Sequence, residues 1–177
     1  MEIKLYNEDN IKENEIDEIV TRVKVFLMND KDELLIANSA GGCQLPGGHQ
    51  ENGEDLETAV VREVQEETGI VLDKTEIIES FYTIKHFTRN YKQSGLNRCS
   101  EMIYFFVRTN KEPDLNNINL TDNEKNNNFA IDKVKLENFD EYINSFINNT
   151  QSEINVIIAK EILAAFKVFK TYLKNNR

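Results

Sequence analysis

Three glutamates near the middle of the chain are spaced so that they share one face of a helix. Glu63, Glu66 and Glu67 stand at positions i, i+3 and i+4, and side chains at this spacing are neighbours, with Cβ atoms about 5–6 Å apart. Three like charges this close destabilise a helix unless a cation lies among them. Oxygen ligands suit hard divalent ions, so the spacing indicates a site for Mg²⁺, with Mn²⁺ as the other ion that fits.

The residues around this cluster follow a fixed pattern, which begins in a Pro-Gly-Gly turn. Its defining positions are Gly48, Glu54, Arg62, Glu63, Val64, Glu66, Glu67, Gly69 and Ile70. This pattern resembles a Nudix box with every defining position filled, and the preceding Leu45-Pro46-Gly47 resembles the usual start of the box. The resemblance implies an α/β fold, a Nudix-type α/β/α sandwich with a mixed central sheet, the box helix and a long C-terminal helix.

The resemblance also implies a hydrolase that cleaves a phosphoanhydride bond of a nucleoside diphosphate linked to another group. It implies metal ligands at Glu63, Glu66, Glu67 and the backbone carbonyl of Gly47, where a glycine lets the backbone approach an ion closely. Metal held there neutralises phosphate charge, helps to activate water and stabilises the leaving group. A solvated acidic helix face is the plain alternative for the three glutamates.

Arg62 and Glu54 are expected to orient the cluster. The planar guanidinium of Arg62 is suited to hold Glu54 or a box glutamate in place, and an ordinary surface ion pair is the alternative. The general base stays open between Glu63 and a carboxylate from a late loop. In that loop Glu124 is better placed than Asp122, although a solvated residue in an Asn-rich segment is the simpler interpretation.

Residues 81–100 form a basic stretch, which has no Asp or Glu and contains Lys85, Arg89, Lys92 and Arg98. Lys85, Arg89 and Lys92 are predicted to contact the phosphates of the substrate, and Tyr91 to stack on its base. The alternative is an exposed loop whose cations balance an acidic surface.

Composition limits the classes of function. The chain has 177 residues and a net charge of −10, which fits a single domain at residues 1–177 and argues against binding to nucleic-acid duplexes. There is no apolar run of the length that a membrane span needs, and the acidic N-terminus does not resemble a signal peptide. Cys43 and Cys99 are too few for a disulfide framework. These features predict a cytoplasmic protein that is not attached to a membrane.

Alternating and helical apolar patterns predict the elements that position the box. Asp55 is expected to cap the box helix at its start and Gly69 at its end. Residues 1–18 are expected to be an N-terminal extension or an edge strand, and residues 152–175 to contain the C-terminal helix. Further strands are predicted at residues 20–28, 34–37, 76–87, 99–109 and 129–134.

The box specifies the chemistry and says little about the leaving group. The proline that ADP-ribose hydrolases often carry beyond the box is absent, as is the arginine signature of coenzyme A pyrophosphatases, and Cys43-Gln44 replaces a frequent aromatic residue. A small nucleotide such as a canonical or oxidised nucleoside triphosphate is the first expectation, before a nucleotide sugar, nucleotide alcohol or dinucleoside polyphosphate. The alternative from another class is a non-catalytic Nudix-fold nucleotide sensor or binding module. A homodimer is possible in either case.

Overall fold

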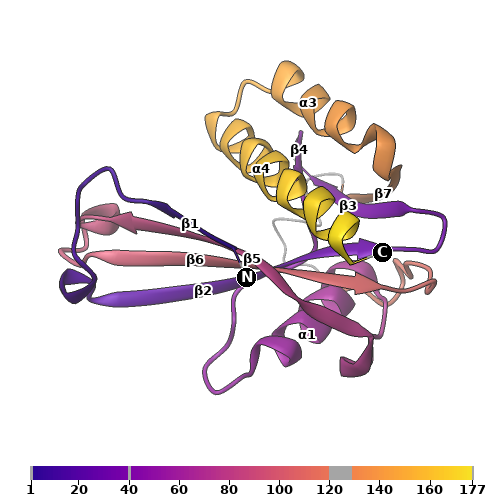
Figure 1. Cartoon of the computed structure of the whole chain (residues 1–177), viewed down its shortest axis with the longest axis horizontal. Helices are drawn as coiled ribbons and strands as arrows, with labels where there is room; N and C mark the ends of the chain where they lie inside the picture. The colour runs from indigo at the N-terminus through magenta and orange to yellow at the C-terminus, as the bar shows by residue number, and fades with distance from the viewer. Residues whose placement is uncertain (1, 40, 120–128, 177) are drawn as a thin grey trace.

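A mixed sheet with helices on both faces forms the centre of the molecule (Figure 1). The computed structural model describes residues 2–39, 41–119 and 129–176. Helix α1 (Leu56–Thr68) covers one face of the sheet, and α3 (Phe139–Asn149) and α4 (Glu153–Asn175) cover the other. The α/β/α sandwich with a box helix and a long C-terminal helix is therefore confirmed. No helix of the described ranges combines the length and the apolar character needed to cross a bilayer.

The sheet has seven strands in the order β1-β5-β6-β2-β3-β4, with β7 paired to β3. The strands are β1 (Glu2–Tyr6), β2 (Glu18–Met28), β3 (Glu33–Ser39), β4 (Gly42–Gln44), β5 (Ile77–Thr88), β6 (Arg98–Arg108) and β7 (Ala130–Lys135). Short 3₁₀ turns are η1 (Glu13–Glu15), η2 (Lys74–Glu76), η3 (Tyr91–Gln93) and η4 (Leu136–Asn138). The pairs β1–β5 and β2–β6 are parallel and the others antiparallel, so the sheet is mixed, as predicted.

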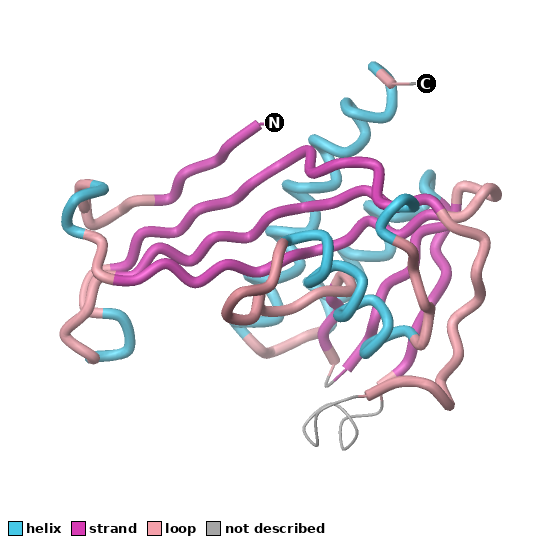
Figure 2. The backbone as a smooth tube through the Cα atoms, turned by 90° about the horizontal axis from the view of Figure 1, so that it is seen from below, coloured by secondary structure: helices cyan, strands magenta, loops and turns pink. Residues whose placement is uncertain are grey.

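Strands β1, β5, β6 and β2 extend beyond the helices as a long arm, whose far end carries η1 and η3 (Figures 1 and 2). β1 lies at the edge of the sheet, next to β5. The box helix α1 packs near the other end of these strands, so the arm presents a long sheet surface that starts at the box.

Two apolar layers fix strand β2 from both sides. Val23, Val25 and Leu27 pack on the α1 side, whereas Phe26 and Met28 pack on the α3 and α4 side. The Phe26 ring stacks on Phe169 of α4 at 4.6 Å between centroids. Since successive residues of a strand point to opposite faces, β2 is anchored in both layers, which makes it a rigid support for whatever lies along its edge.

Helix α3 and the short strand β4 were not predicted from the sequence. α3 buries Phe139 and Ile143, with Phe146 and Ile147 partly buried behind them. These residues follow a helical period, but they stand among Asn and Asp residues that favour turns and loops over helix interiors. Packing against α4 overrides that weak local preference.

Candidate active site

The glycine-containing loop before the box runs along the edge of β2. The amides of Val25 and Val23 donate to the carbonyls of Pro46 and Gly48, both at 2.9 Å, and the loop returns a bond at 3.0 Å from the amide of Gln50 to Thr21. This edge is available because β2 and β3 are in register only at Met28 and Leu34, beyond which β3 pairs with β4 and β7. The loop is thus held by a strand that is itself buried on both faces.

Helix α1 begins and ends where the sequence predicts. The Asp55 carboxylate accepts a bond from the amide of Thr58 at 2.7 Å, and Gly69 takes the left-handed conformation with φ 71°. Ala59, Val60 and Val64 are fully buried against the sheet. These contacts fix the rotation of the helix about its axis and therefore the direction of its glutamates.

Two of the three box glutamates meet consecutive residues of the glycine loop. Oε2 of Glu67 accepts a bond from the Gly47 amide at 2.9 Å. The Glu63 carboxylate lies against Gly48 so closely that a Cβ on that residue would stand 2.5 Å from both carboxylate oxygens. Glu66 instead pairs with Arg62 at 3.2 Å and is more exposed. The structure therefore brings Glu63, Glu67 and the Gly47 backbone together.

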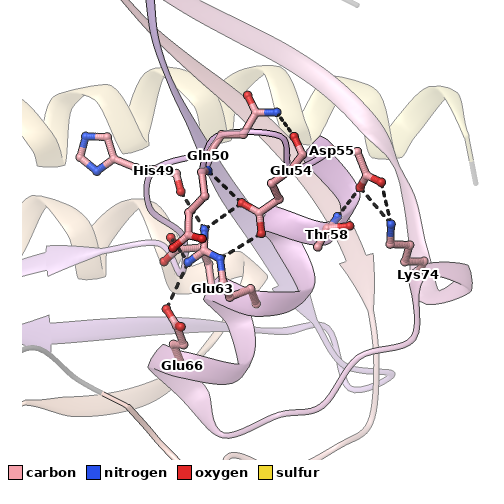
Figure 3. Close-up of polar contacts among 10 residues, drawn as sticks. His49, Gln50, Glu54, Asp55, Thr58, Glu63, Glu66 and Lys74 are labelled. Atoms are coloured by element: carbon pink, nitrogen blue, oxygen red, sulfur yellow. Dashed lines mark hydrogen bonds and ion pairs between the residues drawn. The ribbon is translucent and has the colours of Figure 1, made fainter.

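Arg62 ties three carboxylates into one network. Figure 3 labels these carboxylates, of Glu54, Glu63 and Glu66, and marks their contacts with dashed lines. The Arg62 guanidinium holds Glu54 through Nε at 3.0 Å and Nη2 at 3.1 Å, and Nη1 reaches Glu63 at 2.8 Å and Glu66 at 3.2 Å. Nη2 also donates to the carbonyl of His49 at 2.8 Å. These are the partners that the sequence predicts for Arg62, and a fork with several donors is needed to bind them all.

The pKa values of Glu54 and Glu63, two carboxylates of this network, are shifted in opposite directions. Hydrogen bonds from Arg62 hold the pKa of Glu54 below its usual value. Burial raises the pKa of Glu63, and the hydrogen bond and charge of Arg62 only partly oppose it. Glu63 is 8% exposed, so its negative charge is kept in a poorly solvated position that a nearby cation would stabilise.

Replacing Arg62 by lysine is expected to lower the free energy of unfolding by about 2 kcal/mol, because one ammonium cannot replace a planar fork shared by three partly buried carboxylates. Urea titration followed by circular dichroism measures the change. Lys74→Met is the matched control, since it breaks only the exposed ion pair between Lys74 and Asp55 at the other end of α1. Equal stability of Arg62→Lys and the wild type would mean that the network is loose.

The donors around the loop fit a hard divalent ion. They are the carbonyl of Gly47 and the carboxylates of Glu63 and Glu67, with Glu66 beside them, and oxygen-only sets of this kind suit Mg²⁺ or Mn²⁺. Within the described ranges no three Asp, Glu, His or Cys side chains are grouped as a complete metal site by themselves.

A lysine from β2 lies at the same carbonyl. Nζ of Lys24 donates to the carbonyl of Gly47 at 2.6 Å and to that of Leu45 at 3.1 Å. Burial lowers the pKa of His49, and the charges of Arg22, Lys24 and Arg98 lower it further. Arg98 of β6 is in register with Glu18 of β2, so Arg22, Lys24 and Arg98 lie on one face of the sheet, opposite to Val23 and Val25.

We call Arg22, Lys24 and Arg98 the cationic face. Sequence reasoning identified Arg98 as part of the basic stretch but missed Arg22 and Lys24. The signal was present in β2, where Arg22 and Lys24 alternate with Val23 and Val25. Alternation at period two places both cations on one face of the strand.

The residues predicted to bind substrate lie along the arm. Lys85 pairs with Glu101 at 2.9 Å, and the amide of Arg89 donates to Asp9. Tyr91 and Lys92 belong to η3 at the far end of the arm. The ring of Tyr91 lies under the guanidinium of Arg98 at 3.8 Å from the ring centroid, and Nζ of Lys92 is 5.3 Å from the same ring.

The structure does not bring these four residues to the glutamates directly. Arg98 contacts the ring of Tyr91 and pairs with Glu18 at 2.6 Å. Glu124 and Asp122, the candidates for a general base in the late loop, lie outside the described residues.

Known proteins resemble the chain in sequence and in fold. The family model described as NUDIX domain matches residues 19–154. Nudix hydrolase 25 of Arabidopsis thaliana is 32% identical over 119 residues, which are 61% of this chain and 67% of that protein. An RNA pyrophosphohydrolase of Roseobacter denitrificans is 37% identical over 60 residues, 32% of this chain and 38% of that protein.

Among solved structures, a Caenorhabditis elegans Ap4A hydrolase binary complex has a TM-score of 0.54 at 18% identity and covers 88% of this chain and 98% of its own. The MutT protein of Methanosarcina mazei has a TM-score of 0.53 at 17% identity, with 90% and 96% covered. At this level of identity the likeness concerns the fold. The sequence matches confirm the Nudix resemblance and the expectation of a hydrolase. The chain belongs to the Nudix hydrolase family.

Proposed function

We propose that the chain is an Mg²⁺-dependent enzyme that cleaves a phosphoanhydride bond in a nucleoside diphosphate linked to another group. The observation that carries the proposal is the meeting of Glu63 and Glu67 with Gly48 and Gly47 on a rigid backbone. Catalysis at phosphorus requires side chains that are held in fixed positions, both to orient the reacting groups and to stabilise the charge that develops. A complete box alone would support the same chemistry less strongly, because an exposed acidic face does not need such contacts.

Each residue of the site has a proposed role. Glu63, Glu67 and the Gly47 carbonyl hold the metal, Glu66 is a further ligand, and Glu54 and Arg62 keep the carboxylates oriented. The ion supplies charge neutralisation for the phosphates and makes water a better nucleophile. Proton removal from water falls to Glu63 or Glu124, as predicted from the sequence.

Two groups of cations are available for the phosphates of the substrate. One is the predicted set of Lys85, Arg89 and Lys92 on the arm, with Tyr91 for stacking on the base. The other is the cationic face of Arg22, Lys24 and Arg98. Arg22 forms a bridge with His49 and Lys24 bonds the glycine loop, whereas Arg98 is paired with Glu18. An overall charge of −10 would repel a polyphosphate, so local cations beside the metal are needed to bind it.

The two groups differ in their expected effects on kinetics. Arg22→Ala is expected to raise KM about tenfold at unchanged turnover, because it removes a phosphate contact used in both ground and transition states. Arg89→Ala and Lys92→Ala test the arm in the same way. If KM rises for the arm variants and not for Arg22→Ala, the arm alone binds the phosphates. If KM is unchanged in both arm variants, residues 81–100 do not bind substrate and their cations only balance the acidic surface.

We propose a small nucleotide such as a nucleoside triphosphate as the substrate. The 37% identity to a protein named RNA pyrophosphohydrolase supports a substrate that ends in a chain of phosphates, although the match spans 60 residues. Nucleotide sugars, nucleotide alcohols and dinucleoside polyphosphates follow. The cytoplasmic location and the homodimer stay predictions.

The test is phosphate release in a coupled assay across a panel of nucleotides, in Mg²⁺ and in Mn²⁺. The panel contains canonical and oxidised nucleoside triphosphates, ADP-ribose, nucleotide sugars, dinucleoside polyphosphates and 5′-triphosphorylated RNA. Metal-dependent turnover of one class, lost in Glu67→Gln, is the expected result. Nucleotide binding without turnover of any member would instead indicate the sensor module.

A further inference from the structure

Lys24 is the one side chain of the cationic face with direct bonds to the glycine loop among those described here. It projects from β2 between Val23 and Val25, both fully buried, so its backbone cannot shift. The flexible four-carbon stem brings Nζ to 2.6 Å from the Gly47 carbonyl oxygen. Glu67 binds the amide of the same residue at 2.9 Å. Gly47 therefore has a lysine on its oxygen and a box glutamate on its nitrogen.

The lysine and a divalent ion require the same oxygen atom. A ligand carbonyl binds Mg²⁺ at about 2.1 Å and larger divalent ions at up to about 2.6 Å. A second cation within hydrogen-bond distance of that oxygen would stand a few ångströms from the ion, where two positive charges repel strongly. This repulsion favours a movement of the ammonium away from the carbonyl when metal binds there.

The cationic face gives the displaced ammonium a place to go. Rotation about the side-chain bonds moves Nζ away from the loop on the face that also carries Arg22 and Arg98, where substrate phosphates would lie. A phosphate oxygen is a better acceptor for an ammonium than a carbonyl, since both partners are charged. The movement would therefore become favourable once metal and nucleotide are both present.

We propose that Lys24 is a positioning residue that competes with the divalent ion for the Gly47 carbonyl and transfers to a phosphate of the substrate when the ion binds. This inference rests on the proposed function of the same site. It makes metal and substrate binding mutually supportive, because each favours the same position of Lys24. It also means that the protein without nucleotide holds metal weakly.

The experiment measures Mn²⁺ binding without nucleotide, by electron paramagnetic resonance of the free ion, in the wild type and in Lys24→Met. Removing the competing ammonium is expected to tighten Mn²⁺ binding about tenfold, as for one hydrogen bond to a charged group. In steady-state assays at saturating Mn²⁺ the same variant is expected to raise the KM of its nucleotide, which a purely structural role would not combine with tighter metal binding.

Arg22→Met is the matched control, because it removes a cation from the same face two residues away. It is expected to change Mn²⁺ affinity much less than Lys24→Met; equal tightening in both would reduce the effect to general electrostatics and overturn the proposal. Weaker or unchanged Mn²⁺ binding in Lys24→Met would mean that the lysine only ties the loop to β2. If the methionine variant does not fold, Lys24→Gln, which removes the charge and keeps a shorter polar side chain, is measured in its place with the same expected result.

Glu67→Gln separates this inference from the function on which it rests. If Mn²⁺ binding is weakened by Glu67→Gln and unaffected by Lys24→Met, the metal site stands and only the role of Lys24 is wrong. If Mn²⁺ binding is unaffected by Glu67→Gln as well, the metal site itself is misassigned, and both proposals fail together.

Discussion

Replacing Glu67 by glutamine is expected to reduce turnover about a thousandfold, the size of effect seen when a group that stabilises developing charge is removed. The change is nearly isosteric, and the amide oxygen of glutamine can still accept the bond that the Gly47 amide donates at 2.9 Å. The fold and the loop geometry should survive. What is lost is one negative charge beside the carbonyl proposed to bind the ion.

The assay is metal-dependent phosphate release on the best substrate of the panel, at several Mg²⁺ concentrations. Glu57→Gln is the matched control, since Glu57 is an exposed glutamate in the first turn of the same helix and away from the loop. It is expected to retain wild-type turnover. Comparable activity of Glu67→Gln and Glu57→Gln would show that the metal ligands are assigned wrongly.

The local parts of the site could be predicted from the sequence. The spacing of Glu63 and Glu67 places them on one helical face, and Asp55 and Gly69 bound the helix because capping depends on a few neighbouring residues. Arg62 reaches Glu54, Glu63 and Glu66 as the pattern suggested. Contacts within about a dozen residues follow from helix geometry alone.

The parts of the site that depend on contacts between distant segments of the chain could not be predicted from the sequence. The strands β2 and β3 are neighbours in the chain but pair only at their turn, because β3 continues along β7, almost a hundred residues later in the sequence. Strand partners are selected by packing on both faces, which local sequence does not reveal. The gap that results is filled by the loop of Gly47 and Gly48, so the site depends on a pairing that no local pattern specifies.

Lys24 shows a second limit of prediction from the sequence. Arg22 and Lys24 alternate with Val23 and Val25 along β2, a pattern that is ordinarily interpreted as a strand with one buried and one solvated side. That interpretation is correct for most strands with one covered face. Here the cationic side is bordered by the glycine loop, so the polar residues of the strand carry as much information about function as its apolar residues carry about the fold.

The geometry of the glycine loop and the proposed metal site both depend on Gly47. Its φ is 134°, which disfavours side chains, and a Cβ would stand 2.1 Å from the carbonyl oxygen of Val23. Val23 is fully buried between β6 and α1, so its backbone cannot yield. The loop must move if residue 47 gains a side chain.

Gly47→Ala is therefore expected to lower the free energy of unfolding by about 4 kcal/mol, from backbone strain together with the contact to Val23. Gly53→Ala is the matched control, because Gly53 also has a positive φ, 81°, but a Cβ there would meet nothing within 4 Å. The free energy of unfolding of Gly53→Ala is expected to fall by about 1 kcal/mol, because only the positive φ disfavours a side chain there. Urea titrations of both variants measure the difference. Equal losses would mean that the loop yields easily, and a loop that yields cannot hold the carbonyl, Glu67 and Lys24 in the arrangement on which the proposed metal site depends.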